Sequence, residues 1–132
     1  MFEINAMSRL PVYEQLVEQV ERYVLLGLLP AGSQMPSVRA LSAELTINPN
    51  TIQKAYAELE SRGVFLSVPG RGSFIAEDAA VGIRARRLGE QGSLRKLIRE
   101  LKAAGMTEAE LMAAVTAEFR MQTEENKGGE KS

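Results

Sequence analysis

The chain has 132 residues, a formal net charge of −1 and no cysteine or histidine. Because the thiol and imidazole groups of those residues supply common metal ligands and much nucleophilic chemistry, we expect no metal site, no cofactor and no enzymatic activity. No apolar run approaches the roughly 18 residues of a membrane span, and the first residues lack the layout of a secretory signal. We therefore expect a cytoplasmic protein without a membrane segment, built as one domain with an extension.

Three helices are predicted in the first half of the chain. Apolar residues at helical spacing, Tyr13 among them, indicate a helix over 11–27 whose apolar stripe faces a core. A shorter helix follows, with Ser37 as its cap. The third begins at Asn48 and ends at about Arg62: Asn48 is placed to cap it, and a proline at the next position loses no hydrogen bond.

A β-hairpin is predicted directly after the third helix. Gly63 has the position of a helix C-cap, and two short apolar runs flank the sequence Pro-Gly-Arg-Gly at 69–72, which we expect to form a four-residue tip. Three helices and a hairpin by residue 76 make a compact unit, so we place the first domain at residues 1–76.

The rest of the chain predicts a helical segment at 77–121 and a disordered tail at 122–132, which has no apolar residues. Within residues 79–105, apolar residues recur at helical spacing only in the second half. Gly89 and Gly92 each weaken a helix by about 1 kcal/mol relative to alanine, so we expect a break or a frayed turn there.

Two helices of this segment should form an antiparallel hairpin. Thr107 and Glu110 fit the capping box of the last helix, and only residues 105–106 connect it to the helix before. The apolar side chains of the pair exceed what two helices can bury against each other, so we expect a second copy of the chain to cover them in a symmetric homodimer. The candidate dimer residues are Leu94, Leu97, Ile98, Leu101, Leu111, Val115 and Phe119.

Charge is distributed unevenly along the chain. Residues 82–102 carry seven basic side chains against two glutamates, whereas residues 107–125 carry five glutamates against one arginine. Such runs are usually solvated helix faces, and helices of opposite charge also pair in water. Residues 1–76 contain six basic and seven acidic residues, so any affinity for nucleic acid must come from local placement, dimerisation and the arginines at 84–87.

Only residues 46–47 separate the second and third predicted helices. Such a tight helix-turn-helix projects the start of its second helix outward, where it can enter a DNA major groove. Asn50, Thr51, Gln53 and Lys54 lie at that start, and an Asn or Gln amide can satisfy two groups of adenine together. The alternative is that the sequence Asn-Pro-Asn-Thr is only a well-made helix cap.

The predicted hairpin would follow this helix as a wing. Its tip places Arg71 between Gly70 and Gly72, which let the backbone approach closely, and an arginine suits the narrow minor groove, where negative potential is concentrated. The alternative is a solvent-exposed turn. The expected fold is thus mainly α with a small β-hairpin wing: a winged helix-turn-helix plus a C-terminal two-helix dimerisation hairpin.

The stretch PSVRALSAELTINPNTIQKAYAELESRGVFLSVPGRGSFIA resembles the winged helix-turn-helix of the GntR superfamily of bacterial transcription regulators. The matching motif positions are Pro36, Ser37, Arg39, Asn48, Asn50, Thr51, Glu58, Leu59, Gly63, Gly70, Arg71 and Gly72. The resemblance covers about residues 10–76 and implies DNA contacts by Arg39, Asn50, Thr51, Arg71 and Gly72. With the helix and wing residues above, the candidate DNA-binding set is Ser37, Arg39, Asn48, Asn50, Thr51, Gln53, Lys54, Gly70, Arg71 and Gly72.

The Asn-Pro-Asn-Thr form is similar to the short YtrA-like subgroup and to regulators fused to an aminotransferase-like domain. Only about 55 residues follow the wing, so length favours the YtrA-like subgroup, whose two-helix C-terminal segment serves mainly for dimerisation. The resemblance implies a homodimeric repressor on a palindromic operator of double-stranded DNA, and it leaves open an unidentified small-molecule effector. The alternative is a winged-helix protein-interaction module that does not bind DNA specifically.

Overall fold

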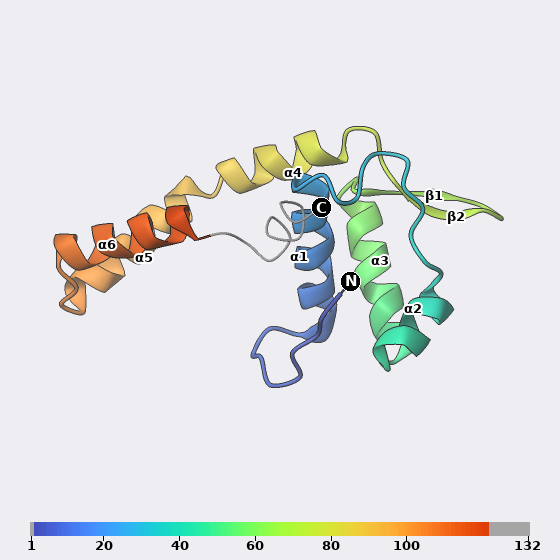
Figure 1. Cartoon of the computed structure of the whole chain (residues 1–132), viewed down its shortest axis with the longest axis horizontal. Coiled ribbons are helices and arrows are strands. Elements are labelled where there is room, and N and C mark those ends of the chain that lie inside the picture. Colours follow the sequence, from blue (N-terminus) through green and yellow to red (C-terminus); the bar gives the residue numbers. More distant parts are fainter. Residues whose placement is uncertain (1, 122–132) are drawn as a thin grey trace. The chain divides into compact units, whose positions relative to one another are not determined.

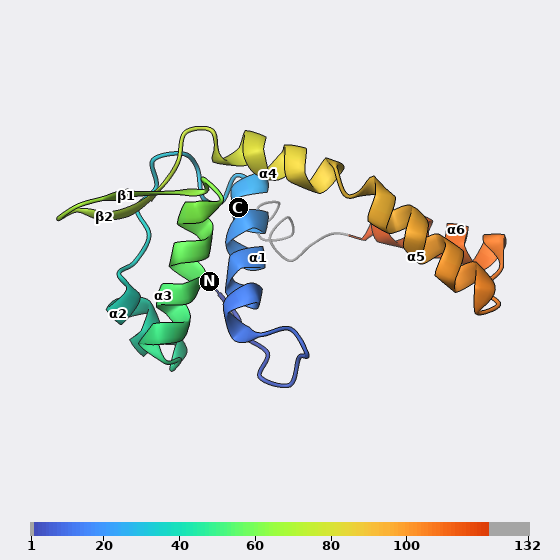
Figure 2. The same ribbon diagram turned by 180° about the vertical axis from the view of Figure 1, so that it is seen from behind.

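The computed structural model describes residues 2–121, which contain six helices and one two-stranded antiparallel sheet (Figures 1 and 2). The chain divides into two compact units, one ending at Ala85 and one beginning at Arg86. The tail predicted for 122–132 lies outside the described residues. No helix within 2–121 is both long enough and apolar enough to cross a bilayer.

The first three helices confirm the predicted start signals. They are α1 (Val12–Leu25), α2 (Val38–Leu45) and α3 (Pro49–Ser61). The Ser37 hydroxyl accepts a hydrogen bond from the N–H of Ala40 at 3.0 Å, and the Asn48 side chain accepts one from the N–H of Asn50 at 2.8 Å. These bonds satisfy N–H groups that have no partner within the helix, so both helix starts are fixed by their own sequence.

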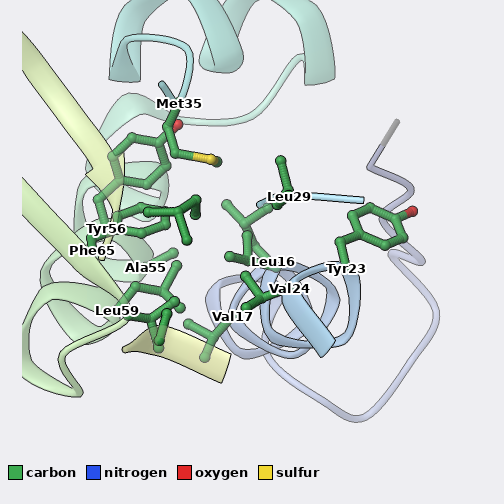
Figure 3. Packing of buried hydrophobic residues seen from close by; sticks show 14 of the residues in the cluster. Leu16, Val17, Tyr23, Val24, Leu29, Met35, Ala55, Tyr56, Leu59 and Phe65 are labelled. Atoms are coloured by element: carbon green, nitrogen blue, oxygen red, sulfur yellow. The ribbon is translucent and has the colours of Figure 1, made fainter. Parts of the chain in front are cut away.

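The core of the first unit forms where α3 packs on α1. In Figure 3, Leu16 and Val17 of α1 face Ala55 and Leu59 of α3. Tyr56 of α3 adds an edge-to-face contact with Phe65, at 5.1 Å between ring centroids. The side chains that are less than 2% exposed include Leu16, Val20, Leu41, Ile52, Leu59, Val64 and Ile83. One face of α3, formed by Ile52, Ala55, Tyr56 and Leu59, is therefore buried in the core.

The predicted wing is present, with a shorter tip than expected. Strand β1 (Phe65–Val68) pairs with β2 (Gly72–Ile75), and the last pair joins Val68 to Gly72. The tip therefore consists of residues 69–71 rather than four residues, because Gly72 is already part of the ladder. The segment before α2 also pairs with β2, which the sequence did not predict: the N–H of Met35 donates to the carbonyl of Ser73 at 2.9 Å.

The segment after the wing contains one more helix than predicted. It holds α4 (Ala79–Leu88), α5 (Gln91–Ala103) and α6 (Glu108–Arg120). Helix α4 was not predicted from the sequence, and its packing rests on only two buried side chains, Ala79 and Ile83. The expected break is confirmed between α4 and α5, and so is the capping box of α6, in which the Thr107 hydroxyl and the Glu110 carboxylate each accept a backbone N–H.

The α5 and α6 helices leave much of their apolar surface in solvent. Leu94 and Leu97 are 56% and 50% exposed, Val115 is also exposed, and Phe119 is 88% exposed. Ile98, Leu101 and Leu111 are half-buried. Among the described residues of α5 and α6, none is fully buried. Residues 86–121, the described part of the second unit, therefore have no closed core of their own.

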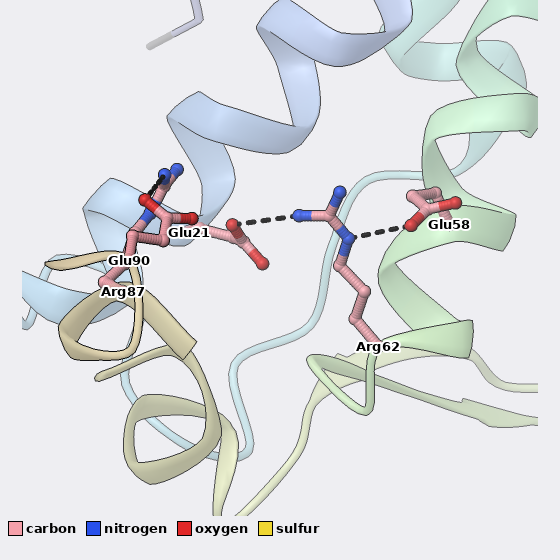
Figure 4. Close-up of polar contacts among 5 residues, drawn as sticks. All are labelled: Glu21, Glu58, Arg62, Arg87 and Glu90. Atoms are coloured by element: carbon pink, nitrogen blue, oxygen red, sulfur yellow. Dashed lines mark hydrogen bonds and ion pairs between the residues drawn. The ribbon is translucent and has the colours of Figure 1, made fainter. Parts of the chain in front are cut away.

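An ion-pair group joins the C-terminal end of α3 to α1 (Figure 4). Glu21 of α1 is only 1% exposed, and Arg62, which ends α3, approaches it with a guanidinium nitrogen at 3.2 Å. A second nitrogen of Arg62 donates to Glu58 at 2.7 Å. Desolvation by itself would lower the pKa of Arg62, but the hydrogen bond to Glu58 and the charge of Glu21 raise it instead. The guanidinium therefore stays charged beside the buried carboxylate.

We expect Arg62→Met to lower the free energy of unfolding by about 2 kcal/mol, since it takes the guanidinium away from a buried carboxylate while keeping the aliphatic stem. The effect is smaller than the roughly 3–5 kcal/mol typical of a fully enclosed pair because about a third of the Arg62 side chain is exposed. Glu58→Gln is the control, and it should cost less than about 0.5 kcal/mol. Equal losses for the two variants in urea denaturation would contradict this account.

Candidate nucleic-acid interface

The polar residues at the start of α3 lie outside its buried stripe. Asn50, Gln53 and Lys54 are exposed and Thr51 is half-buried. The cap of the helix uses the side chain of Asn48 and only the backbone N–H of Asn50. The Asn50 amide is therefore not needed to start the helix. The structure thus separates a capping residue from an exposed residue that can bind another molecule.

Lys54 is held by an aromatic ring of α1. Its ammonium nitrogen lies 4.0 Å from the ring centroid of Tyr13, a cation–π contact. The Tyr13 hydroxyl donates to Glu14 at 3.0 Å, and this hydrogen bond, followed by desolvation and the charge of Glu14, raises the pKa of Tyr13. Tyr13 was predicted to face the core; it is half-buried and supports a cation at the surface. The sequence contains no signal for this contact.

The start of α2 is fixed to α3. The Tyr56 hydroxyl of α3 donates to the carbonyl of Pro36 at 2.7 Å, and burial, followed by the charge of Glu44, raises the pKa of Tyr56 so that the phenol stays a donor. The next residue, Ser37, caps α2 through its oxygen and can still donate its own hydrogen. Arg39 is exposed in the first turn. The start of α2 is thus held against the middle of α3.

The wing tip requires its glycines for backbone reasons. Gly70 and Gly72 have φ angles of 77° and 116°, in the region that L-residues with side chains rarely adopt. Arg71 between them is exposed, and its N–H closes the turn on Val68 at 2.9 Å. The Gln34 side chain donates to the Arg71 carbonyl at 2.8 Å. Gln34 was not among the residues predicted from the sequence.

These elements are arranged on one side of the first unit. In both views α2 and the wing lie on the side of α3 away from α1 (Figures 1 and 2). Arg39 of α2 and Arg71 of the wing form no ion pair within residues 2–121. Exposed amides at the start of α3 therefore lie on an element flanked by two others, each with an exposed arginine. Such an arrangement can hydrogen-bond base edges and attract phosphates.

Comparison with known proteins identifies relatives of the same kind. The family model described as bacterial regulatory proteins, gntR family, matches residues 12–75. The HTH-type transcriptional repressor YtrA of Bacillus subtilis is 42% identical over 79 residues, which are 60% of this chain and 61% of that protein. The uncharacterised HTH-type transcriptional regulator YhcF of the same organism is 34% identical over 109 residues, covering 82% of this chain and 89% of that protein.

Solved structures show the same fold. A structure described as a transcriptional antiterminator from Listeria monocytogenes has a TM-score of 0.77 and 32% identity, with 91% of this chain and 90% of that chain covered. The DNA-binding domain of AraR, in complex with an operator, has a TM-score of 0.52 and 28% identity and covers 57% of this chain and 96% of that chain. The resemblance stated from the sequence is confirmed: the chain belongs to the gntR family of bacterial regulatory proteins and is a DNA-binding transcription regulator, not an enzyme.

Proposed function

We propose that the protein is a cytoplasmic homodimeric repressor that binds a palindromic operator. The observation that carries the proposal is the exposed polar start of α3, which has a cap of its own and is flanked by α2 and the wing. The relative YtrA is a repressor, and the AraR domain was solved on an operator. Both facts concern those proteins, and they support the same action here.

Different residues of the interface would contact different parts of the DNA. Asn50, Thr51 and Gln53 would read base edges in the major groove, because an amide can bond two groups of one adenine. Lys54 would neutralise a phosphate from its position on Tyr13. Arg71 would enter the adjacent minor groove, where potential is most negative over A·T-rich sequence.

Three further side chains would bind the DNA backbone. The hydroxyl of Ser37 and the amide of Asn48 each accept a capping bond and keep hydrogens that can be donated to a phosphate. Arg39 in the first turn of α2 would add a cation. Gly70 and Gly72 would contribute through the backbone, because their positive φ angles form the tip of the wing.

A second copy of the chain is the simplest cover for the apolar face of α5 and α6. Leaving the exposed apolar side chains of those two helices in water costs free energy; they include Leu94, Leu97, Val115 and Phe119. A twofold axis would bring two identical faces together and cover them. A dimer of this kind presents two recognition helices to two half-sites, which is why a palindromic operator is expected.

The α5–α6 hairpin also encloses a hollow of about 280 Å³, lined in part by Ile98, Leu101, Met106 and Leu111. Its size falls just below the range of roughly 300–1,000 Å³ typical of small-molecule sites. Three of these residues belong to the proposed dimer face. Pairing of the two faces would cover the hollow with the second copy, so we assign no effector to it.

The specificity of the α3 surface can be separated from its stability. We expect Asn50→Ala to cost roughly 1–3 kcal/mol on the operator and far less on random DNA, with thermal stability nearly unchanged. Asn48→Ala, which removes the cap, should cost about 1 kcal/mol of folding free energy. Fluorescence anisotropy on both DNAs and thermal unfolding measure these effects. If Asn50→Ala melts the protein but keeps its preference for operator, the assignment of recognition to α3 is wrong.

Lys54→Ala provides the contrasting case at the same surface. Because a phosphate contact carries no sequence information, this change should weaken binding to operator and random DNA alike and lower the slope of log K against log salt by about one unit. A salt titration of both DNAs measures it. A loss confined to the operator would place Lys54 at a base edge instead.

The dimer can be tested with substitutions on exposed apolar side chains. Leu94→Asp combined with Leu97→Asp should give monomers, because two charges would be desolvated on pairing, and operator affinity should fall with the first unit still folded. Val81→Asp is the matched control, since Val81 is 65% exposed on α4 and outside the proposed face. Light scattering coupled to size exclusion measures the mass. A wild-type protein that is monomeric at micromolar concentration would overturn the proposal.

A further inference from the structure

The segment that leads into α2 contacts each part of the DNA-binding surface. The N–H of Gly32 donates to Ile75 at 2.8 Å, and that of Met35 donates to Ser73 at 2.9 Å, so the segment lies along β2 of the wing. One residue later, the carbonyl of Pro36 accepts the hydrogen bond from Tyr56 of α3. The next residue, Ser37, begins α2. Residues 32–37 therefore tie the wing, α3 and α2 together.

Gln34 extends this brace to the tip of the wing. Its backbone pairs with Phe74, and its side-chain amide donates to the carbonyl of Arg71 at 2.8 Å. The amide nitrogen also lies only 3.3 Å from the position that a Cβ on Gly72 would occupy. The close approach that glycine permits at this position is thus made by the side chain of Gln34.

We propose that Gln34 is a positioning residue for the wing, fixing the backbone at Arg71 and hence the direction from which the arginine reaches the minor groove. A two-stranded ribbon is marginally stable alone, so its tip depends on contacts outside the ladder. Holding the Arg71 carbonyl fixes the peptide plane between Arg71 and Gly72, and it lowers the entropy that the arginine loses on binding. The role in DNA binding rests on the proposed function, whereas the ordering of the tip does not.

The test uses the full-length protein and the change Gln34→Met, which keeps the length of the side chain and removes the donor. Gln91→Met is the matched control, because Gln91 is an exposed glutamine on α5. Arg71→Ala and the double variant Gln34→Met with Arg71→Ala complete a double-mutant cycle. The readouts are ¹⁵N relaxation of the amides of residues 70–72 in the free protein, thermal unfolding, and binding to a DNA fragment from the protein's own promoter with A·T-rich flanks.

We expect Gln34→Met to lower the order parameters at the wing tip and leave the midpoint of unfolding close to that of Gln91→Met. Affinity should fall roughly three- to tenfold, the effect of one hydrogen bond. The double variant should bind no more weakly than Arg71→Ala alone, because Gln34 acts through that arginine. Unchanged wing-tip order, or losses that add in full, would overturn the proposal. A looser tip with no loss of DNA affinity in any variant would support the positioning role and contradict the minor-groove contact of Arg71.

Discussion

The packing of α3 on α1 is the contact on which the rest of the first unit depends. Ile52 and Leu59 are fully buried at this contact, and a helix with one buried stripe must present its opposite face to solvent. The same packing that closes the core therefore fixes which residues of α3 face outward. Two polar contacts also tie α3 to α1: Arg62, directly after the last turn of α3, approaches the buried Glu21, and Lys54, near the middle of α3, lies over the ring of Tyr13. The surface that we propose for recognition is therefore positioned by the packing of the core.

Because residues 1–76 are close to neutral, binding to DNA would depend more on this geometry than it does for a basic domain. Residues 1–76 hold six basic and seven acidic side chains, and Arg62 is engaged in an internal ion pair. Non-specific attraction to DNA grows with the number of phosphates neutralised, so few cations imply weak binding to random sequence. In the proposed function, discrimination would then depend on hydrogen bonds from amides such as Asn50, whose position is set by the packing of α3 in the core. Low background affinity favours a high ratio of specific to non-specific binding.

Features that join residues close together in the sequence could be predicted, whereas contacts between distant residues could not. The cap at Asn48 was predictable because a capping bond joins residues two apart, and both lie in one short motif. The hydrogen bond from Gln34 to Arg71 spans 37 residues, and neither a polar residue in a turn-rich loop nor an arginine between glycines indicates its partner. Helix α4 was missed for a different reason. Only Ala79 and Ile83 of α4 are buried, so the apolar repeat is too sparse to indicate a helix.

Pairing through the exposed face of α5 and α6 would matter for DNA binding because residues 1–76 carry few cations. If one copy makes few phosphate contacts, a single half-site gives little affinity, and a second linked copy converts its own binding into an intramolecular step with a high effective concentration. Dimerisation would then be worth more to operator binding than any one side chain of the interface. Exposed residues such as Leu97 and Phe119, which contact no DNA in this proposal, would control affinity through the monomer–dimer equilibrium. Repression would consequently depend on the concentration of the protein more steeply than for a monomeric binder, because occupancy requires both association steps.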